Sequence, residues 1–179
     1  MLTTLRDRGL VEQTRETATV AVLEGDDAIV IHQSNPRFSA LSVDWSGRHT
    51  PLHATAAGKV FLFHMPEDQR LHILERPLQR YTENTILDPT ALQDQLRVGR
   101  DRGYWYTAEE LAIGLNAIAV PIRAADGAVV AAVGVSGPAF ACPRARLSAP
   151  FAESSIAALG SLGFEHIEAL LALLGNPQE

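Results

Sequence analysis

Two β-hairpin signatures stand near opposite ends of the chain and bracket a block of helix signals. Residues 17–33 contain two runs rich in β-branched side chains around the turn sequence Glu24-Gly25-Asp26-Asp27. Residues 116–136 contain two more runs around Ala124-Ala125-Asp126-Gly127, which is the strongest hairpin turn in the chain. Because hairpins pair antiparallel strands and the helices between them need a face to pack on, the pattern predicts an α+β domain, with an antiparallel sheet and helices packed on it.

Proline and glycine mark the ends of the helices between the hairpins. Asp88-Pro89 places an N-cap residue before a proline at the first helical position, and Gly103 closes the apolar stripe that follows. Pro66 followed by two acidic residues gives a similar start, which predicts a helix over 66–75.

The remaining sheet segments are shorter. A third strand is expected over 38–44, followed by a loop over 45–51, and residues 104–106 predict another short strand. Pro121 cannot donate a hydrogen bond to a neighbouring strand, so we expect its strand to lie at an edge or to bulge there.

Both ends of the chain carry helical patterns. Apolar residues at helical spacing predict a short amphipathic helix over 2–13, and a longer helix is expected over 150–174. These two segments are candidate surfaces for self-association, and the alternative is that they only cover the sheet.

Composition narrows the class of protein. A chain of 179 residues with 46% hydrophobic and 20% charged residues is typical of one globular domain, and no stretch has the apolar length of a membrane span. The charged start carries no signal peptide, and Cys142 is the only cysteine, so a cytoplasmic location without disulfides is expected. A net charge of -6 argues against a surface that grips nucleic acid.

Small residues at the start of an apolar helix over 53–63 indicate a ligand site. Ala56, Ala57 and Gly58 carry almost no side chain, so a ligand can approach the N–H groups of the first turn, where the helix dipole favours an anion. The alternative is that the alanines favour the helix and that Gly58 permits close packing against a sheet.

With these elements placed, four stretches of the chain resemble the effector-binding domain of the IclR family of bacterial transcriptional regulators. They are Pro51-Leu52-His53-Ala54-Thr55-Ala56-Ala57-Gly58-Lys59, Arg102-Gly103-Tyr104 with Glu109-Glu110-Leu111, Gly114-Leu115-Asn116-Ala117-Ile118-Ala119-Val120-Pro121-Ile122, and Ala131-Ala132-Val133-Gly134-Val135-Ser136-Gly137-Pro138. The resemblance implies a sensor fold similar to GAF domains, coupled in the family to a winged helix-turn-helix that binds operator DNA. Residues 1–13 are then expected to be a remnant of the linker helix and 14–179 the effector-binding domain, with the DNA-binding module missing from this chain.

The resemblance also implies a set of ligand-binding residues, framed by the small-residue helix, the turn before Leu115 and the strand that ends at Ser136. The set is Leu41, Val43, Ala56, Ala57, Thr107, Leu115, Ala117, Gly134 and Ser136. Small side chains leave volume, and the hydroxyls of Thr107 and Ser136 can bond a ligand. Ser136, which precedes Gly137-Pro138, has the alternative of being only a turn residue.

The implied function is that of a sensor without chemistry of its own. A small organic or aromatic acid shifts the arrangement of a homodimer or homotetramer, and through it the binding of operator DNA. No arginine is among the site residues, so we expect helix N–H groups and hydroxyls to hold the carboxylate. Because Gly134 stands where family members often carry a hydroxyl, the ligand is expected to be larger or less polar. No cofactor, metal or membrane is expected.

Rival functions have weaker support in the sequence. A small hydrolase using Ser136 lacks the Gly-x-Ser-x-Gly spacing, and Gly58-Lys59 lacks the remainder of a phosphate-binding loop. Pro51 separates His49 from His53, which argues against a metal site that also includes His64. Glu109-Glu110 is interpreted as a solvated turn rather than an acid pair, because adjacent residues face apart. A ligand-free oligomerisation module is the third possibility.

Overall fold

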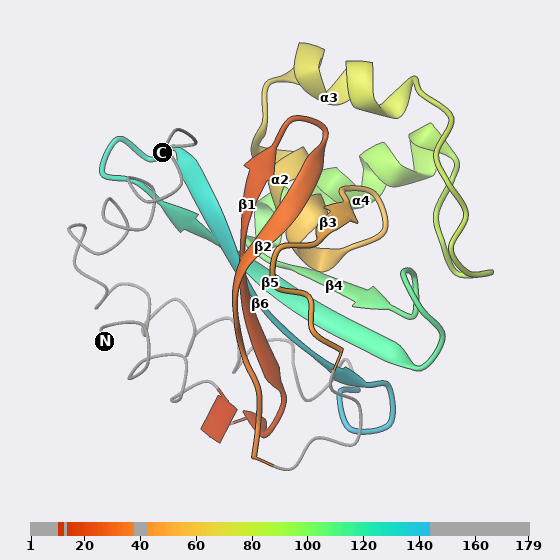
Figure 1. Ribbon diagram of the computed structural model, residues 1–179. Helices are drawn as coiled ribbons and strands as arrows, with labels where there is room; N and C mark the ends of the chain where they lie inside the picture. Colours follow the sequence, from red (N-terminus) through yellow and green to blue (C-terminus); the bar gives the residue numbers. More distant parts are fainter. Residues whose placement is uncertain (1–10, 13, 38–42, 144–179) are drawn as a thin grey trace.

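A computed structural model describes residues 11–12, 14–37 and 43–143 and shows a curled antiparallel sheet with helices on one face (Figure 1). The order of the six strands in the sheet is β3-β2-β1-β6-β5-β4. The strands are β1 (Thr17–Glu24), β2 (Asp27–Ser34), β3 (His49–Pro51), β4 (Trp105–Ala108), β5 (Leu115–Arg123) and β6 (Val129–Pro138), and the helices are α2 (Ala56–His64), α3 (Glu67–Leu74) and α4 (Pro89–Arg102). The predicted fold class is confirmed.

The two expected hairpins form the main part of the sheet. β1 pairs with β2 across a turn in which Gly25 has φ 59°, and β5 pairs with β6 across a turn in which Gly127 has φ 88°. Glycine adopts these left-handed values without a steric penalty, so both turns form where the sequence predicts them. β1 also pairs with β6, which joins the hairpins into one sheet.

Pro121 occupies a local edge of the sheet. β4 pairs with β5 from Ala108 to Trp105, whose partner is Ala119, and its pairing does not extend to Pro121. The pairing of β5 with β6 also shifts register between Ile122 and Arg123. Proline is therefore tolerated here for the reasons anticipated from the sequence.

The helices cover one face of the sheet (Figure 1), with α2 packed on β5, β6 and α4. Val60, Phe61, Leu62 and Phe63 of α2 are buried in the core between the helices and this face. The opposite face of the sheet carries a second buried cluster that includes Ile118, Val120, Val133 and Val135. The alternation of side chains along β5 and β6 thus places small residues on the helix-covered face and large β-branched residues on the other.

The caps of α4 agree with the sequence signals, and the start of α3 differs by one position. The side chain of Asp88 accepts a hydrogen bond from the N–H of Ala91, and Gly103 ends α4 with φ 75°. Pro66 is the N-cap of α3 rather than its first helical residue. The proline ring tolerates either position because neither needs its missing N–H.

The third strand, predicted over 38–44, is wrong at residues 43–44, which are the part of it that the structure describes. Val43 and Asp44 are irregular, and the strand beside β2 is instead β3, inside the segment expected to be a loop. Residues 38–42 and the helix expected over 150–174 lie outside the described residues, as does most of the helix expected over 2–13. No helix among the described residues is long and apolar enough to cross a membrane.

Candidate functional site

A recess of about 70 Å³ lies where the first turn of α2 meets the sheet. Its lining is mostly apolar, with four hydroxyl-bearing residues among it. The lining residues are Thr19, Ala21, Val30, Trp45, Thr50, Thr55, Ala56, Ala57, Leu111, Leu115, Ala117, Ile118, Ala119, Gly134, Val135 and Ser136.

Six of the nine residues predicted for the ligand site meet in this recess. They are Ala56, Ala57, Leu115, Ala117, Gly134 and Ser136. Strand pairing explains the convergence, because Ala117 lies opposite Ser136 and Ala119 lies opposite Gly134 on adjacent strands. Directly paired residues share one face of a sheet, and here it is the face covered by α2.

The other three predicted residues do not line the recess. Thr107 lies opposite Ala117 but is buried, and its hydroxyl is 3.5 Å from the carbonyl oxygen of Ala117. Val43 is 45% exposed and is not among the lining residues. Leu41 lies outside the described residues.

Several lining residues are not predicted from the sequence. Thr19 and Ala21 alternate along β1 with Val20, whose partner in β6 is Val133, and this period of two could have identified them. Trp45 lies in irregular chain and is held by a hydrogen bond from its N–H to the side-chain oxygen of Gln33. No local pattern in the sequence indicates that Trp45 turns toward the recess.

The first turn of α2 has one backbone N–H group bonded to a capping side chain and two others that can bond a ligand. The hydroxyl of Thr55 accepts a hydrogen bond from the N–H of Gly58 at 3.1 Å and donates to the carbonyl of Pro51 at 2.8 Å. Within the described chain, no hydrogen bond is found from the N–H groups of Ala56 and Ala57. These two N–H groups lie at the positive end of the helix, so they can donate hydrogen bonds to an anion.

Gly58 also packs closely, as the alternative interpretation of this segment proposed. A Cβ at this position would overlap the backbone of Leu52 and crowd the Thr55 hydroxyl. The close contact is with the turn before the helix rather than with the sheet. Gly58 therefore sets the position of the first turn of α2, while Ala56 and Ala57 line the recess.

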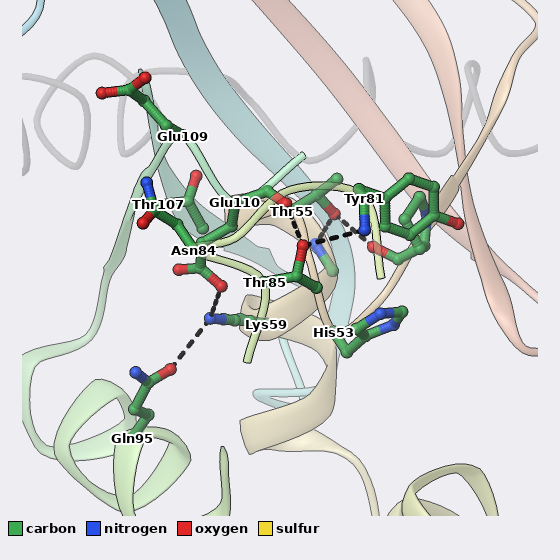
Figure 2. Close-up of polar contacts among 12 residues, drawn as sticks. His53, Thr55, Lys59, Tyr81, Asn84, Thr85, Gln95, Thr107, Glu109 and Glu110 are labelled. Carbon is green, nitrogen blue, oxygen red and sulfur yellow. Dashed lines mark hydrogen bonds and ion pairs between the residues drawn. The ribbon is translucent and has the colours of Figure 1, made fainter. Parts of the chain in front are cut away.

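One turn further along α2, a buried ion pair lies behind the recess (Figure 2). The ammonium of Lys59 is 2.5 Å from Oε2 of Glu110 and 2.9 Å from Oε1 of Gln95, and it lies 5.5 Å from the ring centroid of Trp105. Burial lowers the pKa of Lys59 and raises that of Glu110, and each partner's charge opposes the effect of burial on the other.

The prediction of a solvated turn at Glu109-Glu110 is wrong for Glu110, because the loop folds its carboxylate under the helices. The side chains of Glu109 and Glu110 do face apart, as predicted (Figure 2). The carboxylate of Glu109 accepts a hydrogen bond from the N–H of Gly114. Thr82 donates to the carbonyl of Glu109 at 2.7 Å, and Thr85 donates to the carbonyl of Glu110 at 2.8 Å. These bonds anchor the chain immediately before Leu111, which lines the recess.

The three histidines considered for a metal site have separate partners. His49 pairs with Glu24 at 3.2 Å, and His64 lies against the carbonyl of Val60. Nε2 of His53 is 2.9 Å from the carbonyl oxygen of Gln79, which ties the chain before α2 to the segment after α3. Among the described residues, no three His, Cys, Asp or Glu side chains gather as a metal site.

Comparison with known proteins gives a consistent set of similarities. Residues 4–158 match the family described as Bacterial transcriptional regulator IclR C-terminal. The HTH-type transcriptional regulator BhcR of Paracoccus denitrificans is 36% identical over 158 residues, which cover 88% of this chain and 56% of that protein. The chain spans about half the length of the curated relatives it matches.

Two solved structures are similar over most of the chain. The C-terminal domain of the E. coli transcriptional regulator KdgR is 32% identical with a TM-score of 0.73, and the match covers 93% of each chain. An IclR homolog from Microbacterium hydrocarbonoxydans, complexed with 4-hydroxybenzoate, has a TM-score of 0.78 at 23% identity and shares the fold. That match covers 86% of this chain and 63% of the other.

Proposed function

Since the chain belongs to the IclR family of bacterial transcriptional regulators and comprises its C-terminal domain, we propose that its recess binds a small organic acid that controls the intact regulator. The acid's carboxylate contacts the first turn of α2, and the rest of the molecule lies against β1, β5 and β6. The domain senses this ligand without transforming it.

The proposal rests on the backbone N–H groups of two residues that line an apolar recess and that have no hydrogen-bond partner among the described residues. Ala56 and Ala57 place two N–H donors there, and the recess residues include no arginine or lysine to compete for an anion. The hydroxyls of Thr19 and Ser136 supply further donors from the strands. Backbone amides at a helix start, with hydroxyls opposite, are a suitable set for a carboxylate.

The size of the recess favours a compact ligand. A volume of about 70 Å³ is small for a ligand site, because pockets for drug-sized ligands have about 300–1,000 Å³. We therefore expect an acid of a few carbons, rather than the larger of the two kinds of ligand anticipated from Gly134. For an aromatic acid such as the 4-hydroxybenzoate of the Microbacterium protein, we expect Trp45 or Leu111 to move outward.

Control of transcription follows from a population shift. A ligand that binds one arrangement of the domain more tightly than another changes the balance between the two. In a homodimer or homotetramer this balance sets the spacing of winged helix-turn-helix modules on operator DNA, in the cytoplasm. Residues 14–179 form the sensing domain in this proposal, and residues 1–13 belong to the linker toward the DNA-binding module.

A hydrolase using Ser136 has no comparable support. Ser136 lies within β6, opposite Ala117, and not on the strand-to-helix turn that exposes a serine nucleophile. The residues that line the recess include no histidine or carboxylate that could take its proton. An oligomerisation module that binds no ligand gives no function to the N–H groups of Ala56 and Ala57, which have no partner among the described residues.

Calorimetric titration of the chain with sodium pyruvate, succinate, benzoate and 4-hydroxybenzoate tests the proposal. Ala57→Asp adds an unpaired negative charge at the anchor, and we expect at least about a tenfold loss of affinity with unfolding still cooperative. Ala91→Asp is the matched control, because Ala91 is exposed in the first turn of α4, away from the recess. Unchanged affinity in Ala57→Asp rejects the site, and ester turnover that is lost in Ser136→Ala indicates the hydrolase instead.

A further inference from the structure

A second groove lies at the far end of α2, between α3 and α4. It has a volume of about 260 Å³ and an apolar floor made of Phe63 and Leu96. Its rim carries three arginines together with polar and acidic side chains. The rim residues are Glu67, Arg70, Gln93, Asp94, Arg97 and Arg100.

We propose that this arginine-lined groove binds the phosphoryl group of a small molecule, separately from the acid recess. The chain has 15 Lys and Arg against 21 Asp and Glu, so three arginines around one groove are a local reversal of its overall charge. An arginine guanidinium presents a planar fork of donors that matches phosphate oxygens bidentately. The floor made of Phe63 and Leu96 suits the apolar part of a phosphorylated molecule.

The three guanidinium groups are available to different degrees. Nε of Arg100 donates to the carbonyl of Phe63 at 2.8 Å, which caps the end of α2 and fixes the arginine while its terminal nitrogens remain for a ligand. Arg97 pairs with Asp94 three residues before it, and both side chains are mostly exposed. An exposed pair of this kind is weak because water screens both charges, so a phosphate can displace the carboxylate. No partner for the guanidinium of Arg70 is found among the described residues.

The neighbouring His64 does not offset the positive charge of the arginines. Nδ1 of His64 donates to the carbonyl of Val60 at 2.9 Å, so Nε2 is the acceptor for Arg123, 2.5 Å away. Burial lowers the pKa of His64, and the charges of Arg123 and Arg100 lower it further. The end of α2 therefore has a positive field next to the groove, and the acids of the groove, Glu67 and Asp94, are outnumbered by its arginines.

A polyanion such as DNA fits this region less well than a small molecule. The net charge of -6 repels a long chain of phosphates beyond the groove, whereas one or two phosphoryl groups contact only the arginines. The cavity also has depth and an apolar floor, which a nucleic-acid backbone does not use.

Titration of the chain with sodium pyrophosphate at constant ionic strength tests the proposal. We expect saturable binding and a rise in the unfolding temperature, and at least about a tenfold loss of affinity in the double variant Arg70→Gln/Arg97→Gln. Arg80→Gln removes an exposed arginine outside the groove and should bind as the unsubstituted chain does. Ala57→Asp should also retain pyrophosphate binding, so that a failure of the acid recess and a failure of this groove give different results.

Three outcomes overturn the proposal. The first is the absence of saturable pyrophosphate binding, and the second is equal binding by the double arginine variant and the unsubstituted chain. The third is that a 20-base-pair DNA duplex binds more tightly than pyrophosphate and that the double variant no longer binds the duplex. The last result assigns the arginines to nucleic acid. Circular dichroism of the double variant checks that its helices are intact.

Discussion

Lys59 and Glu110 form an ion pair in the interior of the domain, with Nζ 2.5 Å from Oε2 and with side-chain exposures of 0% and 9%. Lys59 belongs to α2, whose first turn borders the acid recess, and Glu110 immediately precedes Leu111, which lies on the other side of the recess. Gln95 of α4 is the second partner of the ammonium. The pair therefore joins α2, α4 and the loop after β4 directly behind the proposed ligand.

Removal of one partner of this pair should be far more costly than removal of both. Lys59→Met leaves the carboxylate buried without its counter-ion, and we expect a loss of about 3–5 kcal/mol in the free energy of unfolding. Lys59→Met/Glu110→Leu replaces both charges with apolar groups and should recover most of that loss. Urea unfolding of these two variants and of Glu110→Leu completes the double-mutant cycle.

The exposed pair Arg97 and Asp94 supplies a matched control for that cycle. Arg97→Met should change the free energy of unfolding by less than about 1 kcal/mol, because the pair is mostly solvated. If the Lys59 and Glu110 substitutions are additive, the two groups act independently and the buried pair has no structural role.

The sequence predicts elements whose causes are local. The turns at Gly25 and Gly127 and the cap at Asp88 depend on neighbours within a few residues, and they are confirmed. The Lys59 pair could not be predicted in this way, because its partner is 51 residues away and adjacent acidic residues are usually solvated. The third strand failed for a related reason, since pairing with β2 at His49–Pro51 prevailed over local β propensity at residues 43–44.

The recess was only partly predictable. The family resemblance identified Ala117, Gly134 and Ser136, and strand pairing brings these residues to one face of the sheet. Trp45 and Leu111 come from irregular segments whose course depends on hydrogen bonds to distant residues. The N–H of Trp45 donates to the side chain of Gln33, and Thr85 donates to the carbonyl of Glu110, just before Leu111.

Gly58→Ala should destabilise the domain although alanine is the better helix former. The added Cβ meets the Leu52 backbone, which cannot rotate away, so we expect a cost of about 2–3 kcal/mol after the gain of about 1 kcal/mol in helix propensity. Gly99→Ala in α4 is the comparison, because its Cβ would meet ring atoms of Phe63 and Trp105. Side-chain rings can shift by a few tenths of an ångström, so Gly99→Ala should cost less. Thermal and urea unfolding give the ranking, and equal stability of Gly58→Ala and the unsubstituted chain contradicts the close packing.

Stability should fall as the solution is acidified from about pH 7 to pH 5. Burial lowers the pKa of His53, with the charge of Lys59 acting in the same direction, while its bond to Gln79 opposes the shift. A histidine with a lowered pKa in the folded state contributes stability above its unfolded value of about 6.5, and this contribution is lost as pH falls through that value toward the folded pKa. His64 shifts in the same direction.

The variant His53→Gln isolates the contribution of His53. Glutamine can still donate to the carbonyl of Gln79 but does not titrate, so the slope of unfolding free energy against pH should become shallower by up to about 1.4 kcal/mol per pH unit. Urea unfolding at pH intervals of about 0.5 makes the comparison, and parallel curves for His53→Gln and the unsubstituted chain would falsify it.

The pair Ala119 and Gly134 should set the size of acid that the recess accepts. The two residues lie opposite each other on β5 and β6 and both line the recess. A Cβ on Gly134 would lie 3.2 Å from the carbonyl oxygen of Ile118 and 3.3 Å from the hydroxyl of Thr19, so these neighbours must shift by a few tenths of an ångström. Gly134→Ala therefore fills ligand space, and we expect about a tenfold loss of affinity for succinate, with less effect on the smaller pyruvate.

The exchange of the two residues provides the test of this size rule. Gly134→Ala/Ala119→Gly moves the methyl group across the strand pair and keeps the total side-chain volume constant, so part of the lost affinity for succinate should return. Ala119→Gly alone enlarges the recess and should raise the affinity for benzoate relative to pyruvate, at a cost of about 1 kcal/mol in stability for glycine in a strand. Calorimetric titration of each variant with the three acids measures these ratios. If the ratios of affinity among the three acids are the same in all variants, the ligand does not contact this strand pair, because a methyl group beside a bound acid must discriminate by size.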